Sequence, residues 1–166
     1  MKIPPPNSYK QAVVTKMGAS YDVFVETGTY NGDMVWAQRD NFSTIYSVEL
    51  SDELYGRAQK RFLDIKHIKL YHGHSPDFLK EILVDLEPSL FWLDAHYSGG
   101  NTALGDTPCP LLEELDVILD SGVKHALLID DARCFGTLKG FPSLSQIEDK
   151  IGDFKIENDI IWKILQ

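Results

Sequence analysis

Five short apolar runs, separated by longer amphipathic stretches, constrain the fold of this sequence more than any other feature. The runs cover residues 23–25, 44–48, 68–71, 90–93 and 126–129. Each run is nearly continuous in residues that pack in cores, and this pattern is typical of strands buried on both faces of a parallel sheet. The sequence therefore predicts a parallel β-sheet at the centre of the molecule.

The stretches around the runs favour helices. Helices are expected over residues 9–17, 54–62 (behind a capping Ser51), 75–83 or 77–83, and 111–119. In the last three, apolar side chains recur every three or four residues, which places them on one helix face. Alternating strands and helices imply right-handed crossovers and an open sheet with helices on both faces.

The C-terminal segment departs from this alternation. Residues 154–156 and 160–164 have the composition of two strands, and residues 157–159 between them form a tight turn. Such a hairpin adds an antiparallel strand to the parallel sheet. The predicted fold is a Rossmann-like α/β domain over residues 1–166, in which residues 1–20 form an N-terminal extension and the leading helix.

The charge of the chain restricts its partners. The formal net charge is −9 at pH 7, and the Lys and Arg residues are scattered along the sequence. Nucleic-acid binding proteins usually carry a basic patch, and anionic membrane surfaces attract basic segments. We therefore expect a small-molecule partner, and neither a nucleic acid nor a membrane.

The sequence carries no sign of export. No run approaches the roughly 20 apolar residues of a membrane-spanning helix, and residues 1–8 lack the apolar core of a secretory signal. The two cysteines, Cys109 and Cys134, suit a reducing compartment, in which a disulfide between them is not expected. We expect a cytoplasmic protein.

Acidic residues stand at or just after the ends of four apolar runs. They are Glu26, Glu49, Asp94, Asp130 and Asp131. The carboxyl ends of parallel strands share one edge of the sheet, and ligands bind there near the switch point. Strand ends also become polar simply because they reach solvent, but the repetition favours a ligand site at this edge.

The turn after the first run, residues 26–33, contains two glycines. Gly28 permits a tight reversal, and Gly32 permits close backbone approach where the next helix begins. A dinucleotide fingerprint requires a glycine at position 30, against the pyrophosphate, and Tyr30 stands there. S-adenosylmethionine has no phosphates and tolerates a bulkier residue. Glu49, about 20 residues after Gly28, can accept hydrogen bonds from both hydroxyls of a ribose.

Together these motifs resemble those of class I S-adenosylmethionine-dependent methyltransferases. The resemblance rests on the turn at 26–32, Val48-Glu49, Gly73-His74-Ser75, Leu93-Asp94 and Ile129-Asp130-Asp131, and it spans roughly residues 20–165. It implies a sheet of about seven strands with one antiparallel strand. The residues that it implies for the cofactor site are Glu26, Thr27, Gly28, Thr29, Tyr30, Gly32, Glu49, Leu50, His74, Ser75 and Asp94.

The resemblance also implies roles within that set. Gly28 and Gly32 line the methionine portion of the cofactor, and Glu49 holds the ribose. The adenine lies near His74 and Ser75. Asp94 lies near the reacting methyl group.

A narrower resemblance is to metal-dependent O-methyltransferases of the catechol and macrocin types. These enzymes place an aspartate after the fourth strand and an acidic pair after the fifth, where this chain has Asp94, Asp130 and Asp131. Crowded carboxylates raise one another's pKa unless a cation neutralises them, and oxygen ligands favour Mg²⁺ or another hard divalent cation. Alternatively, Asp130 and Asp131 point apart. This chain departs from the pattern of the catechol-type enzymes at Tyr97, where those enzymes carry a lysine.

We expect Asp94 and His96 to be the catalytic residues of a transfer to a hydroxyl of a small molecule. A histidine with a pKa near 6.5 suits removal of the hydroxyl proton, although His96 could equally serve a structural role. The polar loop 98–107, or a second subunit of a homodimer, is expected to cover the site.

Two alternatives stay open. A non-catalytic cofactor-binding or interaction protein can have the same fold. A nicotinamide-dependent oxidoreductase shares the first turn and Glu49, but Tyr30 and the terminal hairpin weigh against it.

Overall fold

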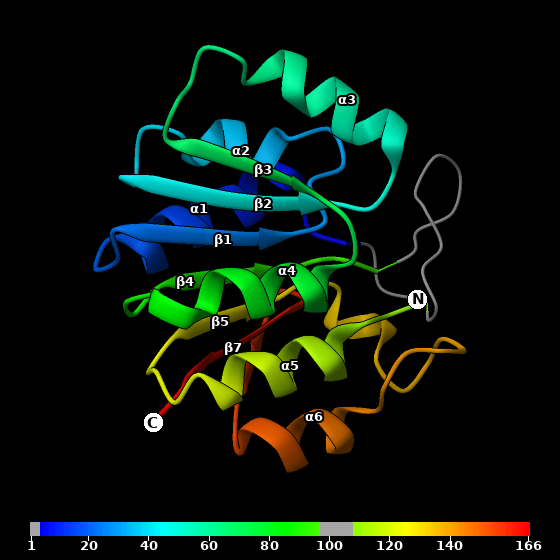
Figure 1. The fold of residues 1–166 in the computed structure, drawn as a ribbon. Coiled ribbons are helices and arrows are strands. Elements are labelled where there is room, and N and C mark those ends of the chain that lie inside the picture. The colour runs from blue at the N-terminus through cyan, green and yellow to red at the C-terminus, as the bar shows by residue number, and fades with distance from the viewer. Residues whose placement is uncertain (1–3, 97–107) are drawn as a thin grey trace.

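A seven-stranded mixed sheet forms the centre of the protein, which is described here by a computed structural model of residues 4–96 and 108–166 (Figure 1). The strands are β1 (Val23–Thr27), β2 (Thr44–Glu49), β3 (Ile68–His72), β4 (Leu90–Leu93), β5 (Ala126–Ile129), β6 (Lys155–Glu157) and β7 (Ile160–Ile164). Their order across the sheet is β3-β2-β1-β4-β5-β7-β6. The predicted loop over residues 98–107 lies outside the described residues.

The pairing of the strands confirms the predicted fold class. β1 pairs in parallel with β2 on one side and with β4 on the other. β5 continues the parallel part, and β7 runs antiparallel to both β5 and β6. The strand order reverses between β1 and β4, and in open sheets of this kind ligands bind beyond the carboxyl ends at that point.

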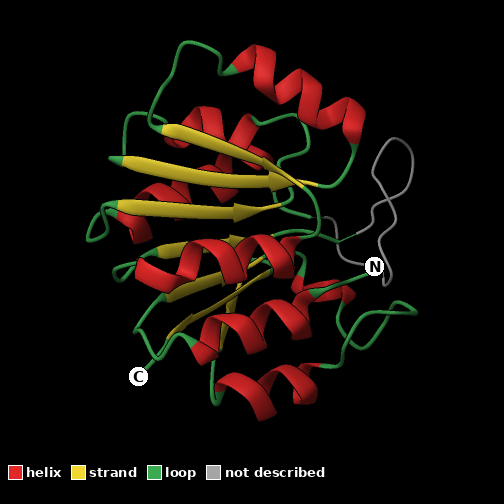
Figure 2. Cartoon of the chain, in the orientation of Figure 1, coloured by secondary structure: helices red, strands yellow, loops and turns green. Residues whose placement is uncertain are grey.

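Helices cover both faces of the sheet, as Figure 2 shows. One face carries α1 (Asn7–Gly18), α2 (Asp33–Gln38) and α3 (Asp52–Arg61), and the other carries α4 (Ser75–Ile82), α5 (Leu111–Asp120) and α6 (Leu144–Ile151). Two short 3₁₀ helices, η1 (Leu83–Asp85) and η2 (Ala132–Cys134), complete the described elements. The helices expected from the sequence correspond to α1, α3, α4 and α5.

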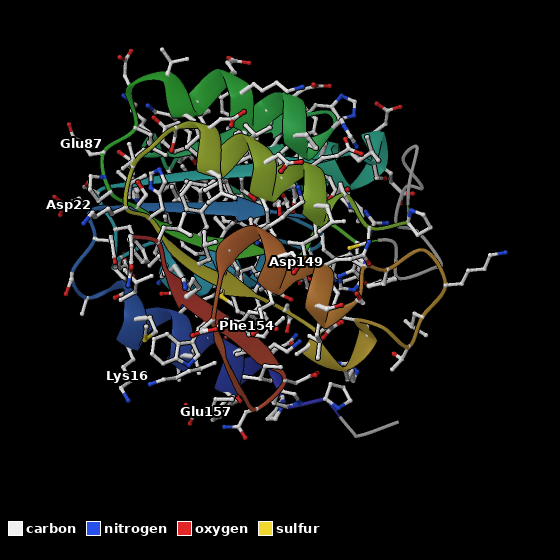
Figure 3. All side chains as sticks on the ribbon, turned by 90° about the horizontal axis from the view of Figure 1, so that it is seen from below. Lys16, Asp22, Glu87, Asp149, Phe154 and Glu157 are labelled. Atoms are coloured by element: carbon white, nitrogen blue, oxygen red, sulfur yellow. The ribbon has the colours of Figure 1, made fainter. Side chains whose placement is uncertain are left out.

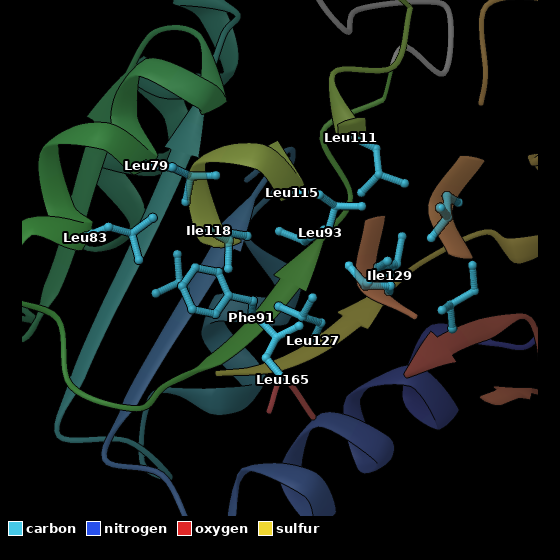
Figure 4. Close-up of a cluster of buried hydrophobic side chains, with 14 of the residues drawn as sticks. Leu79, Leu83, Phe91, Leu93, Leu111, Leu115, Ile118, Leu127, Ile129 and Leu165 are labelled. Carbon is cyan, nitrogen blue, oxygen red and sulfur yellow. The ribbon is translucent and has the colours of Figure 1, made fainter. Parts of the chain in front are cut away.

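Two hydrophobic cores follow from the strand alternation. In β4, Phe91 and Leu93 face the core under α4, α5 and α6, whereas Leu90 and Trp92 face the core under α1, α2 and α3. Figure 4 shows the first of these cores, with side chains of α4 and α5 packed on β4 and β5. Both faces of the central strands are therefore buried, as their continuous apolar composition requires.

α6 lies outside the helices that the sequence predicts. It begins with a capping box, in which the Gln146 backbone N–H donates to Ser143 Oγ at 3.2 Å and the Ser143 backbone N–H donates to Gln146 Oε1 at 2.8 Å. Ser-x-x-Gln before an apolar residue is a recognisable signal of a helix start.

Most charged residues outside the strand ends lie on the surface of the molecule. Lys16, Asp22, Glu87 and Glu157 are exposed and stand at its rim in Figure 3, and Asp149 on α6 is exposed as well. None of the helices in the described part of the chain combines the length and the apolar character that crossing a bilayer requires. Cys109 and Cys134 are both free thiols.

Candidate active site

A cavity of about 280 Å³ opens at the carboxyl edge of the sheet. From the strand ends it is lined by Glu26, Gly28, Thr29, Tyr30, Trp92, Asp94, His96, Asp130 and Asp131, and from α1, α2 and the turn before α2 by Asn7, Lys10, Gln11, Asn31, Asp33 and Met34. Of the strand-end acids, Glu26, Asp94, Asp130 and Asp131 thus lie around one cavity, whereas Glu49 is not among its lining residues.

Glu26 is the last residue but one of β1 and is only 2% exposed. The hydroxyl of Ser47, on β2, donates a hydrogen bond to Glu26 Oε2 at 2.5 Å, and Ser47 Oγ also lies 2.7 Å from Thr29 Oγ1. Burial raises the pKa of Glu26 to about 8, although the Ser47 hydrogen bond works in the opposite direction. The side chain is therefore a buried acid that stays largely protonated at neutral pH.

Gly28 lets the β1 turn approach the end of β4. Its φ is +88°, and a Cβ at this position would lie 2.6 Å from the backbone oxygen of Asp94. Thr27 connects the same two strands, because its backbone oxygen accepts from the Asp94 N–H at 3.1 Å. Any side chain at position 28 would push the turn away from β4.

Gly32 is constrained by its own backbone conformation and by a close side chain. Its φ is +74°, and a Cβ there would lie 2.7 Å from Cε2 of Phe62, just beyond α3. It does not line the cavity. The structure therefore gives Gly32 a packing role, and its contact with the methionine portion of a cofactor stays a prediction.

Glu49 holds the backbone of the glycine turn. Its Oε2 accepts from the Tyr30 N–H at 2.7 Å, and its Oε1 accepts from the Ser51 N–H at 2.9 Å. Each carboxylate oxygen can accept a second hydrogen bond. The turn and the acid therefore lie side by side at the carboxyl edge of the sheet, and the contact of Glu49 with a ribose stays a prediction.

Tyr30 stands at the mouth of the glycine turn. Its backbone has a positive φ of 49°, 53% of the residue is exposed, and it lines the cavity together with Gly28 and Thr29.

The remaining predicted cofactor residues lie near this edge but outside the cavity. The backbone oxygen of half-buried Leu50 lies 3.2 Å from His72 Nε2. His74 is the residue before α4, and Ser75 is its first residue, with 5% exposure. Their contacts with an adenine stay predictions.

Asp94, Asp130 and Asp131 form an ionic cluster with three basic side chains, in which Asp130 and Asp131 are buried and Asp94 is half-buried. Lys10 Nζ lies 2.5 Å from Asp130 Oδ2 and 3.1 Å from Asp131 Oδ1. His96 connects the segment after β4 with the segment after β5. Its Nδ1 lies 3.2 Å from Asp94 Oδ1, and its Nε2 lies 3.2 Å from Asp131 Oδ2.

Arg133 completes the cluster, and its guanidinium pairs with both Asp131, at 2.7 Å, and Asp159. Because Lys10 Nζ contacts both Asp130 and Asp131, these two side chains converge. This contradicts the alternative in which they point apart.

The cluster sets the charge of its members. Burial raises the pKa of Asp94, and the neighbouring Asp130 charge adds to this effect. Burial opposes ionisation of Asp131 and His96, but their mutual hydrogen bond and nearby charges outweigh it, so the pKa of Asp131 is lowered and that of His96 is raised. Likewise the pKa of Lys10 is raised despite burial, mainly by Asp130. Lys10 is therefore a persistent cation.

The predicted site of Asp94, Asp130 and Asp131 does not fit a divalent metal ion as the side chains stand. The acidic and imidazole groups that approach within 4.8 Å of one another among the described residues are Asp94, His96 and Asp131, in place of the predicted trio with Asp130. The Lys10 ammonium already contacts Asp130 and Asp131. A divalent ion bound to that pair would have to displace a cation that the fold supplies.

Sequence reasoning missed Lys10 and Glu114. Lys10 belongs to no local motif, and only the packing of α1 brings it to β5. Glu114 is 1% exposed, and its Oε1 has no hydrogen-bond partner among the described residues. Burial raises the pKa of Glu114 to about 7. A signal for Glu114 was present, because it falls on the apolar face of its helix between Leu111 and Leu115.

Neither a protein-family model nor the sequence of a curated protein matches this chain. Solved structures do match. The methyltransferase PaMTH1 from Podospora anserina, solved with SAH bound, superposes with a TM-score of 0.68 at 16% identity, over 96% of this chain and 77% of that protein. An O-methyltransferase from Bacillus cereus in complex with SAH gives 0.67 at 13% identity, over 99% and 83%.

The 23S rRNA methyltransferase ErmE is also similar, with a TM-score of 0.63 at 13% identity, over 99% of this chain and 70% of that protein. These likenesses establish that the chain has the fold of class I S-adenosylmethionine-dependent methyltransferases. At such low identity they leave the methyl acceptor undetermined.

Proposed function

We propose that the protein is an S-adenosylmethionine-dependent methyltransferase that acts on a hydroxyl of a small molecule. One observation carries this proposal: the glycine turn and the Asp94–His96 pair line the same cavity at the switch point of the sheet. A cofactor and an acceptor held there would meet beside groups able to move a proton. SAH is bound in two of the similar structures, which supports the choice of cofactor.

The residues present fit this cofactor. Gly28 keeps the β1 turn against β4 with no side chain in the way. Glu49 retains one accepting position on each carboxylate oxygen, as two ribose hydroxyls require. The absence of a glycine at position 30 is consistent with a ligand that has no pyrophosphate.

The chain's own groups would align and deprotonate the acceptor. When bound, the cofactor supplies a methyl group on a sulfonium, which an acceptor oxygen can attack in line. Asp94 and Asp131 hold the His96 ring from both sides. In its neutral form, His96 would accept the hydroxyl proton as the oxygen attacks.

A small molecule is favoured over RNA as the acceptor, even though an rRNA methyltransferase is among the similar structures. The formal net charge of −9, and a cavity rimmed by carboxylates, oppose binding of a phosphate backbone. A divalent cation remains a subsidiary alternative. If such a cation takes part, the rate of methyl transfer should rise with added Mg²⁺ and should depend on Asp130.

Calorimetry with S-adenosylmethionine and, separately, with NAD⁺ tests the cofactor. We expect S-adenosylmethionine to bind and NAD⁺ not to bind. Glu49→Ala should weaken binding by at least about tenfold, because a ribose would lose hydrogen bonds to a charged group. Glu53→Ala, which removes an exposed acid from the next helix, is the matched control and should leave binding unchanged.

Methyl transfer to a panel of alcohols, phenols and vicinal diols, assayed with and without Mg²⁺, then tests the reaction. Cofactor binding without transfer to any acceptor would favour the non-catalytic alternative. Binding of NAD⁺ in place of S-adenosylmethionine would favour the oxidoreductase.

A further inference from the structure

Lys10 joins the N-terminal helix to the acidic pair at the end of β5. Its Nζ lies 2.5 Å from Asp130 Oδ2 and 3.1 Å from Asp131 Oδ1, although the residues are about 120 positions apart in the chain. Lys10 is 9% exposed, and all three side chains line the cavity. An ammonium therefore stands where the sequence predicts a divalent cation.

Lys10 retains a donor for a ligand. An ammonium has three N–H groups. Within residues 4–96 and 108–166, Nζ donates two hydrogen bonds, to Asp130 and to Asp131. The third donor is available to an oxygen atom in the cavity, which Asp94 and His96 also line.

Arg133 makes this corner of the site still less suitable for a metal ion. Its guanidinium lies 2.7 Å from Asp131 Oδ1, the same oxygen that Lys10 contacts, and it is anchored by Asp159. A divalent ion on Asp130 and Asp131 would thus have to displace one cation and stand beside another, and like charges at such distances repel strongly in a partly buried site.

We infer that Lys10 is the resident cation of the acceptor site, where its ammonium binds the acceptor oxygen and takes the place of a divalent metal ion. The inference rests on the proposed methyl transfer. The acceptor O–H gives its proton to His96, the oxygen forms a bond to the methyl carbon, and the carbon–sulfur bond breaks with its electron pair left on sulfur. The ammonium stabilises the negative charge that develops on the oxygen.

Metal binding tests the cation role without any assay of activity. Mn²⁺ is titrated into the full-length protein and followed by electron paramagnetic resonance. We expect no bound Mn²⁺ at micromolar concentrations in the wild type or in Lys16→Met, which removes an exposed lysine from the same helix. Lys10→Met should gain one Mn²⁺ site per chain, and the double variant Lys10→Met/Asp131→Asn should lose it again.

Steady-state kinetics test the role in the reaction. Addition of EDTA should leave the wild-type rate unchanged. Lys10→Met should lower kcat by about 100-fold with little change in the KM for S-adenosylmethionine, as expected when one donor to a developing negative charge is removed. Lys10→Arg keeps the charge and should retain more activity than Lys10→Met, whereas Lys16→Met should match the wild type.

The outcomes separate the inference from the proposed function. A wild-type protein that binds one Mn²⁺ ion in an Asp131-dependent manner, or whose rate falls in EDTA, overturns the role of Lys10. This result does not depend on whether Lys10→Met folds. Failure of methyl transfer to every acceptor overturns the proposed function, and the Mn²⁺ titration would still decide which cation the acidic pair holds.

Discussion

Glu26 illustrates how the environment of a single side chain links stability to pH. Its pKa of about 8 results mainly from burial and lies above the ordinary value of 4.5. A folded state that raises the pKa of an acid favours its protonated form. Below about pH 4.5, Glu26 is protonated in both the folded and the unfolded state and does not lower the free energy of unfolding. As the pH rises from 4.5 toward 8, it lowers that free energy progressively.

Replacement of Glu26 by glutamine should remove this pH dependence. The variant keeps an oxygen that can accept from Ser47 but carries no titrating proton. We expect its free energy of unfolding, relative to the wild type, to increase by up to about 4 kcal/mol between pH 5 and pH 8. Urea unfolding at both pH values measures this difference. Glu53→Gln, on the exposed surface, should show no such trend, and an equal trend in both variants would contradict the account.

At the scale of secondary-structure elements, the β6–β7 hairpin does more than extend the sheet. Asn158 and Asp159 have φ values of 47° and 70°, as the tight turns that connect hairpin strands require. The turn reaches back to the loop after β5. The Ala132 N–H donates to the Asp159 backbone oxygen at 2.8 Å, and the Arg133 N–H donates to Asp159 Oδ1 at 2.7 Å. The hairpin thus holds the loop that carries Asp131.

Asp159→Gly tests this support, because glycine tolerates the positive φ and only the side chain is lost. Arg133 would lose both a hydrogen-bond acceptor and an ion-pair partner. We expect a loss of about 2 kcal/mol in the free energy of unfolding, measured by urea denaturation. Asn158→Gly makes the same change at the neighbouring turn position, where the side chain donates one exposed hydrogen bond to the Tyr9 hydroxyl, and should cost no more than about 1 kcal/mol. Equal losses would assign the effect to turn geometry.

At the scale of the whole molecule, local patterns predicted the sheet and the grouping of Asp94, Asp130 and Asp131 at its edge, but not the ion pairs that these acids make. β4 and β5 are continuous apolar runs followed by acids, so their burial and the edge they share can be read from composition. Lys10 carries no such signal, because its partner Asp130 is contributed by a distant strand and the contact depends on how α1 packs. His96 was identified by its chemistry, but its place between Asp94 and Asp131 is tertiary information.

The net charge of −9 also acts on the molecule as a whole, because like charges spread over a small surface repel and favour expansion. Added salt screens exposed charges much more than a buried cluster such as that of Lys10 and Asp130. We therefore expect the Tm to rise by a few degrees between about 20 mM and 300 mM NaCl, where screening becomes effective.

The exposed acids Asp22, Glu87 and Glu157, which stand at the rim in Figure 3, allow a direct test. The triple variant Asp22→Asn/Glu87→Gln/Glu157→Gln removes three negative charges from the formal −9 and should have a higher Tm at low salt, with a smaller rise on salt addition. Lys16→Gln adds to the excess of negative charge and should steepen the rise. Scanning calorimetry at both salt concentrations measures these slopes. If the wild type, the triple variant and Lys16→Gln show the same rise of Tm with salt, the salt effect comes from specific ion pairs and not from overall repulsion.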